Sequence, residues 1–146
     1  MYQPLPMVKT MYYKDLNLYR YFIGREDQSV NENNMMKRID QQLFVTKTII
    51  DLHDLTKLKN RHLRNYMTKY LMIMMTISSV FLIKIGTEDA LKKKDELWEY
   101  LETKNRKMFK DISRTLLGKS SKLQSRPGQE IVKVGYEVAR KLFHFN

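Results

Sequence analysis

The side chains most able to take part in chemistry lie in one short segment, Gly24 to Ser29 (Gly-Arg-Glu-Asp-Gln-Ser). An arginine such as Arg25 can bind phosphate through two parallel hydrogen bonds. A helix that begins just after the segment would direct its free N–H groups toward an anion. The same residues also suit an ordinary connection between a strand and a helix. Both interpretations, an anion site and a simple connection, stay open on physical grounds.

A second candidate is a stripe of basic side chains near the C-terminus: Lys104, Arg106, Lys107, Lys110 and Arg114. Residues 103–146 carry 11 basic and 3 acidic side chains, a balance of +8 in a chain with net charge +11. Next to the apolar Met108, Phe109 and Ile112, such a stripe suits a membrane with acidic lipids. It could also neutralise nucleic-acid phosphates or form a solvated face without a ligand. No nucleic-acid-binding motif accompanies the charge, so we favour the membrane over nucleic acid.

The chain shows no complete set of catalytic residues. Its eight aspartates include no Asp-x-Asp pair, which would suit a divalent metal on a diphosphate. The absence of cysteine excludes disulfides, cysteine zinc sites and thiol catalysis. Gly118-Lys119-Ser120 ends like a phosphate loop but lacks the upstream glycine and the preceding strand. We therefore expect no catalytic residue, metal or cofactor in this chain.

The elements that would position these residues are mostly helices. With 146 residues, 42% hydrophobic side chains, five glycines and three prolines, the chain fits one small helical bundle better than a β-sandwich. Aromatic and β-branched residues between 8 and 23, interrupted by Lys14 to Asn17, predict a short N-terminal β-hairpin. The uncharged run from Tyr70 to Ile83 is too short to span a membrane and predicts a buried core helix.

About five helices are expected after the hairpin. The first begins at a capping box, Ser29 with Glu32 three residues later, and runs to about Lys57. The second covers residues 60–85 and ends at Gly86, and Thr87 then caps a third that fades near residue 105. A short helix around Phe109 ends at residue 118, a loop covers residues 118–128, and a last helix covers residues 129–143.

The block YRYFIGREDQSVNE, followed by MKRIDQQLFVTKTIIDL, resembles the region just after the catalytic domain of bacterial family 2 glycosyltransferases of the capsule, exopolysaccharide and teichoic-acid type. The resemblance continues through LWEYL, FKDISRTLLG and IVKVGYEVARKLFHFN and so covers most of the chain. The first block is the specific part, whereas the later helices match by pattern. No catalytic residue is carried over, because the Asp-x-Asp motif and the catalytic base have no counterpart here.

The resemblance implies that residues 1–28 are the hairpin and loop at the end of a catalytic α/β domain, and residues 29–146 a helical C-terminal domain. The loop after the hairpin then lies near the donor diphosphate and the acceptor, with Arg25, Gln28 and Ser29 as the expected contacts. The whole enzyme would use Mg²⁺ or Mn²⁺ and bind a nucleotide-sugar and a glycan acceptor through its catalytic domain. This chain alone would be inactive.

The function expected from these observations is that of a C-terminal accessory region of a sugar transferase acting on a cell-envelope polysaccharide or lipid-linked acceptor. It would be cytoplasmic and peripheral at the inner face of the cell membrane, with its basic helices against anionic lipid. The alternative is a freestanding basic helical module that binds an anionic membrane, a protein or nucleic acid. Exposed hairpin edges and the methionine-rich helix would also allow a homodimer.

Overall fold

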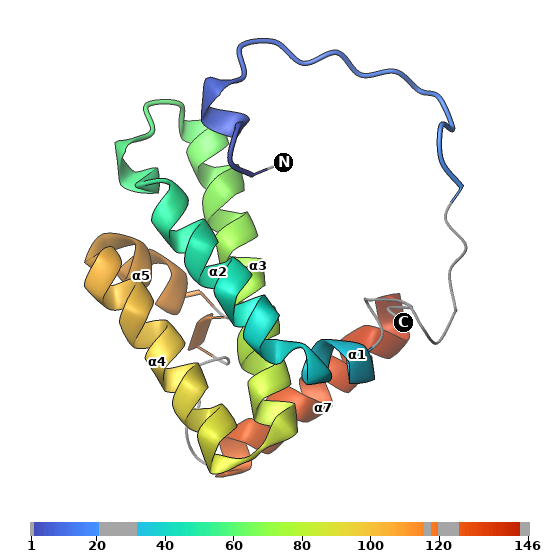
Figure 1. Cartoon of the computed structure of the whole chain (residues 1–146), viewed down its shortest axis with the longest axis vertical. Coiled ribbons are helices and arrows are strands. Elements are labelled where there is room, and N and C mark those ends of the chain that lie inside the picture. The colour runs from blue at the N-terminus through green and yellow to red at the C-terminus, as the bar shows by residue number, and fades with distance from the viewer. Residues whose placement is uncertain (1, 21–31, 116–117, 120–125, 144–146) are drawn as a thin grey trace.

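The computed structural model describes residues 2–20, 32–115, 118–119 and 126–143. These residues form a helical bundle, as the sequence predicts, with no β-strand among them (Figure 1). The helices are α1 (Glu32–Lys37), α2 (Ile39–Leu52), α3 (Arg61–Ile85), α4 (Glu88–Lys104), α5 (Arg106–Ser113) and α7 (Arg126–Phe143). Two short 3₁₀ turns, η1 (Leu5–Met7) and η2 (Leu55–Lys57), accompany them.

Local capping explains the bounds of α3 and α4. The Asn60 side chain accepts hydrogen bonds from two backbone N–H groups of the first turn of α3. Gly86 ends this helix in the left-handed conformation (φ 70°), which glycine adopts without steric cost. Thr87 caps α4 by accepting from the N–H of Ala90. The predicted second and third helices are therefore confirmed almost to the residue.

The other boundaries differ from the prediction. The first predicted helix is interrupted at Arg38 (φ −106°, ψ 24°), which separates α1 from α2, and α2 ends before the η2 turn. The predicted short helix ends at Ser113 rather than at residue 118, because Ile112 O accepts from both the N–H and the hydroxyl of Thr115 in a tight turn. The last helix begins at Arg126, three residues early, with Pro127 in its first turn.

The core lies where α2, α3 and α4 pack against one another. It consists of large apolar side chains, with Leu71, Met75, Leu82, Leu97 and Leu101 fully buried. Trp98 is buried in this core, and its indole N–H donates to Ser79 Oγ at 3.0 Å. Thr46 and Ser78 share a hydrogen bond of 3.0 Å between α2 and α3. Polar groups in the core are thus paired with one another, which removes the cost of burying them.

The predicted N-terminal hairpin over residues 8–23 is not shown by the structure. Residues 8–20 contain no strand and run in an extended path away from the helices (Figure 1), and residues 21–23 lie outside the described part. The side chains of Tyr12, Tyr13 and Leu18 are 84, 82 and 88% exposed. A two-stranded hairpin is at best marginally stable in water without a third strand or a helix to pack on. This segment meets neither within the described residues.

Candidate anion-binding site

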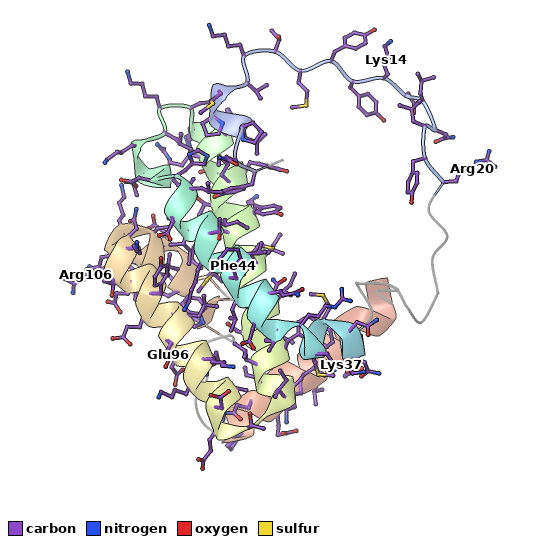
Figure 2. All side chains as sticks on the ribbon, viewed as in Figure 1. Lys14, Arg20, Lys37, Phe44, Glu96 and Arg106 are labelled. Atoms are coloured by element: carbon purple, nitrogen blue, oxygen red, sulfur yellow. The ribbon has the colours of Figure 1, made fainter. Side chains whose placement is uncertain are left out.

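The predicted basic stripe is exposed. Its five side chains come from the end of α4, from α5 and from the residue after α5, and Figure 2 shows Arg106 pointing away from the bundle. Met108 and Ile112, however, are buried in the core, and the ring of Phe109 contacts that of Trp98 edge-on at 6.2 Å. The apolar side of α5 thus faces inward. The expected surface that combines the basic stripe with these apolar side chains is not formed.

Lys104 differs from the other members of the stripe because it is paired. Its Nζ lies 3.0 Å from Asp51 Oδ1, and it sits over the ring of Tyr100 at 5.2 Å. Tyr100 donates its hydroxyl hydrogen to Asp51 at 2.6 Å. The hydrogen bond from Lys104 to Asp51 raises the pKa of Lys104, and the one from Tyr100 lowers the pKa of Asp51. This group joins α4 to α2 and is structural.

The remaining basic residues of α5 lie close to a second basic group that the linear stripe did not include. The η2 turn and the start of α3 pack against α5 and carry Lys57, Lys59, Arg61 and Arg64. Asp54 Oδ2 lies 3.4 Å from Lys57 Nζ, so one of these charges is partly balanced. Two regions distant in the sequence, residues 57–64 and α5, thus place their cationic side chains at one end of the bundle.

A pocket of about 240 Å³ opens between η2, α3 and α5. It is lined by Leu55, Thr56, Arg64, Thr68, Lys107, Met108 and Asp111. Two apolar side chains form part of its wall, and the other five residues supply a guanidinium, an ammonium, two hydroxyls and a carboxylate. Of the predicted basic stripe, only Lys107 lines this pocket.

The walls of the pocket are held by hydrogen bonds between the three elements. Arg64 Nη1 donates to the carbonyl of Leu58 at 2.9 Å, which fixes the guanidinium against the end of η2. Asp54 accepts from the hydroxyl of Thr56 at 2.6 Å and from Asn105 Nδ2 at 2.8 Å, which ties η2 to the start of α5. The bonds from Thr56 and Asn105 lower the pKa of Asp54. The η2 turn and the guanidinium of Arg64 are therefore held in place at the wall of the pocket.

The chemistry this arrangement supports is binding of a small anion. Arg64 and Lys107 attract negative charge, and the hydroxyl of Thr68 can donate or accept a hydrogen bond. The hydroxyl of Thr56 donates to Asp54 and can only accept from a ligand. Across the described part of the chain, no group of three or more His, Asp or Glu side chains could hold a metal ion.

Sequence reasoning missed Thr56, Arg64 and Thr68. Each is an ordinary residue within a helix or turn, and no linear motif joins positions 56, 64 and 107. Only the packing of η2 and α5 on α3 brings them together. The other predicted site, at Arg25, Gln28 and Ser29, lies outside the described residues.

One described helix, α3, is long and apolar enough to cross a membrane by length and composition. Half of its most apolar window is buried against other helices of the bundle, where Leu71, Met75 and Leu82 form the core. This burial agrees with the buried core helix that the uncharged run from Tyr70 to Ile83 predicts. Comparison with known protein families, with curated proteins and with solved structures finds no match to this chain.

Proposed function

We propose that this chain is the helical C-terminal region of a glycosyltransferase that elongates a cell-envelope polysaccharide or modifies a lipid-linked acceptor. In this proposal residues 29–146 hold the enzyme at the inner, anionic face of the membrane. The sugar transfer itself belongs to a preceding catalytic domain, which would bind the nucleotide-sugar and the divalent metal. Among the described residues, no group of three or more His, Asp or Glu side chains could hold that metal.

The observation that carries the proposal is the exposed apolar segment between residues 8 and 20. Soluble proteins rarely leave several adjacent large apolar side chains in water unless another surface covers them. Met11, Tyr12, Tyr13 and Leu18 are all exposed here. A strand pair that completes the sheet of a catalytic domain would bury these side chains. This location agrees with the resemblance of YRYFIGREDQSVNE to the end of that domain in family 2 glycosyltransferases.

The charge distribution supports the membrane part of the proposal. Arg106, Lys107 and Lys110 are exposed, and none forms an ion pair with a described acidic side chain. Basic side chains near an anionic leaflet contribute about 1 kcal/mol each, and this contribution is screened by salt. The buried apolar side of α5 means that this contact is electrostatic and involves no insertion by that helix.

Immunoblotting of the source cells with an antibody against this chain tests the link to a catalytic domain. We expect a band heavier than 17.6 kDa by at least a whole domain. A single band near 17.6 kDa would contradict the proposal and favour the freestanding binding module. We also expect the purified chain to release no sugar from nucleotide-sugars, and measurable release would contradict its predicted inactivity.

Co-sedimentation with vesicles tests the membrane contact. The chain should bind vesicles containing an anionic lipid and not neutral phosphatidylcholine vesicles, and binding should weaken as salt rises. Replacing Arg106 and Lys110 together by glutamine should reduce binding several-fold. Lys92→Gln is the matched control, because Lys92 is an exposed lysine on α4 away from α5. Equal, negligible binding to both vesicles would exclude this contact, and salt-dependent binding to duplex DNA alone would favour the alternative module.

A further inference from the structure

The hydroxyl of Thr68 differs in its hydrogen bonding from the other serine and threonine hydroxyls of α2 and α3. The hydroxyls of Thr46, Thr48, Thr76, Ser78 and Ser79 each donate to the backbone carbonyl four residues earlier. Thr68, in the same kind of helical position, makes no hydrogen bond to any described residue and lines the pocket between η2, α3 and α5. Its hydroxyl is therefore available to a molecule in that pocket.

The pocket also contains charged groups with spare hydrogen-bonding capacity. Arg64 uses one N–H of its guanidinium on Leu58 and makes no other hydrogen bond to the described part of the chain. Lys107 lines the same pocket and forms no ion pair with a described residue. A guanidinium and an ammonium around one small cavity match the oxygens of a phosphate group.

The carboxylate of Asp111 further limits the charge and the chemical groups of a ligand that fits the pocket. This carboxylate lines the pocket and, among the described residues, forms no ion pair within 4.0 Å, even with Lys107 one turn away. A carboxylate only accepts hydrogen bonds, so it would repel a second phosphate but bind a hydroxyl. Two cations and one anion leave a net charge of +1, which one singly charged phosphate diester balances. The matching ligand therefore carries a phosphate and a hydroxyl within the span of the pocket.

The size of the pocket sets an upper limit on the ligand. Pockets for drug-sized molecules measure roughly 300–1,000 Å³, and this one measures about 240 Å³. We infer that the pocket between η2, α3 and α5 binds a small, singly charged phosphate diester with a neighbouring hydroxyl, of the phosphoglycerol type. In the lipid form this group is the headgroup of phosphatidylglycerol. That source depends on the proposed membrane contact, whereas binding of the free ester does not.

Vesicles that differ only in headgroup test the inference. Phosphatidylglycerol and phosphatidylserine each carry one net negative charge, but only the former presents hydroxyls beside its phosphate. The intact chain should bind phosphatidylglycerol vesicles about 2- to 12-fold more tightly, the range expected for one added hydrogen bond. Thr68→Val should remove this preference and leave binding to phosphatidylserine unchanged. Asp111→Asn should also remove the preference, but it should strengthen binding to both vesicles because it removes a negative charge. Thr48→Val, an exposed threonine on α2, is the matched control and should retain it.

Titration of the chain with free glycerophosphoglycerol, a singly charged phosphate diester with hydroxyls, followed by amide NMR shifts, separates the free ester from the lipid headgroup. Shifts confined to the residues around Thr56, Thr68 and Asp111, and absent in Thr68→Val, would support the pocket without any membrane. Equal binding to both anionic vesicles, with no such shifts, would overturn the inference while leaving the membrane contact intact. Loss of binding to both vesicles, with the shifts preserved, would instead contradict the membrane contact. Circular dichroism of each variant confirms that it remains folded.

Discussion

Two amphipathic helices of this chain, α5 and α7, have opposite relations to the core. The apolar side of α5 is buried through Met108 and Ile112. On α7 only Val132 is a buried large apolar side chain among those described, and Ile131, Val134 and Val138 are 67, 61 and 50% exposed. The two helices lie toward opposite ends of α4 (Figure 1). A 3.6-residue pattern thus identifies which residues share a face but not whether anything covers it.

The cause of this difference is how each helix is attached. A single residue, Asn105, separates α4 from α5, so α5 must fold back at once onto α3 and η2. Among the described elements, the main contact of α7 is with the end of α3, through Val132 against Val80 and Ile83. The ring of Tyr136 adds an edge-on contact with Phe81 at 6.1 Å. The one-residue connection to α4 places α5 against the bundle, whereas α7 is held there by its side-chain contacts with α3.

The largest expected effect is a loss of stability, and it tests directly whether the apolar side of α5 is buried and that of α7 exposed. Ile112→Ala should lower the free energy of unfolding by about 2–5 kcal/mol, because it leaves a cavity in a packed core. Val134→Ala, a truncation of similar kind on the exposed side of α7, should change it by about 0.5 kcal/mol or less. Urea denaturation of both variants measures the difference. Equal losses would show that a surface outside the described residues covers α7.

The second prediction concerns the attachment of α7. The ammonium of Lys84 contacts Glu32 on α1 and lies 2.7 Å from Glu137 on α7, and it also sits over the ring of Tyr136. Lys84→Met should lower the free energy of unfolding by about 1–3 kcal/mol, because it removes a cation that contacts two partly buried carboxylates. Hydrogen exchange should accelerate in α7 more than in α5. Uniform acceleration in both helices would contradict this specific role.

The pH dependence of stability follows from the same group. Burial acts to lower the pKa of Lys84, but its hydrogen bonds to Glu137 and Glu32 outweigh burial and raise the pKa above the ordinary 10.5. The contribution of Lys84 to stability is therefore fully present below pH 10.5 and is lost as the pH rises through the raised value. The stability difference between the native chain and Lys84→Met should shrink over that alkaline range. A difference that stays constant there would contradict this origin.

The sequence predicts features whose causes are local and misses those that arise from packing. Asn60, Gly86 and Thr87 act on their own backbone neighbours, so the bounds of α3 and α4 were predictable. The interruption at Arg38 has no breaker residue in the sequence, and the inward orientation of Met108 depends on α3 and η2. Lys107 was predicted as part of a basic stripe. Its grouping with Thr68 required the tertiary contacts of α5.

A third, smaller effect tests why α5 is held to the bundle. The side chain of Asn105 accepts from the N–H of Met108 at 3.0 Å and donates to Asp54 at 2.8 Å, so it both caps α5 and ties it to η2. Asn105→Ala should lower the free energy of unfolding by about 1 kcal/mol. Asn105→Asp keeps the cap but places a carboxylate against Asp54, and it should also destabilise. Unchanged stability of both variants in urea denaturation would show that packing alone holds α5.

The smallest expected effect has the opposite sign and probes the outer face of α7. Gly135 lies inside this helix, and a Cβ added there would meet no atom within 4 Å. Gly135→Ala should therefore raise the free energy of unfolding by about 0.5–1 kcal/mol, because alanine loses less backbone entropy in a helix. Gly86→Ala is the control and should destabilise, because Gly86 has a positive φ that alanine rarely adopts. Destabilisation by Gly135→Ala would mean that another surface packs closely on α7 at this point, and the contrast with α5 would then disappear.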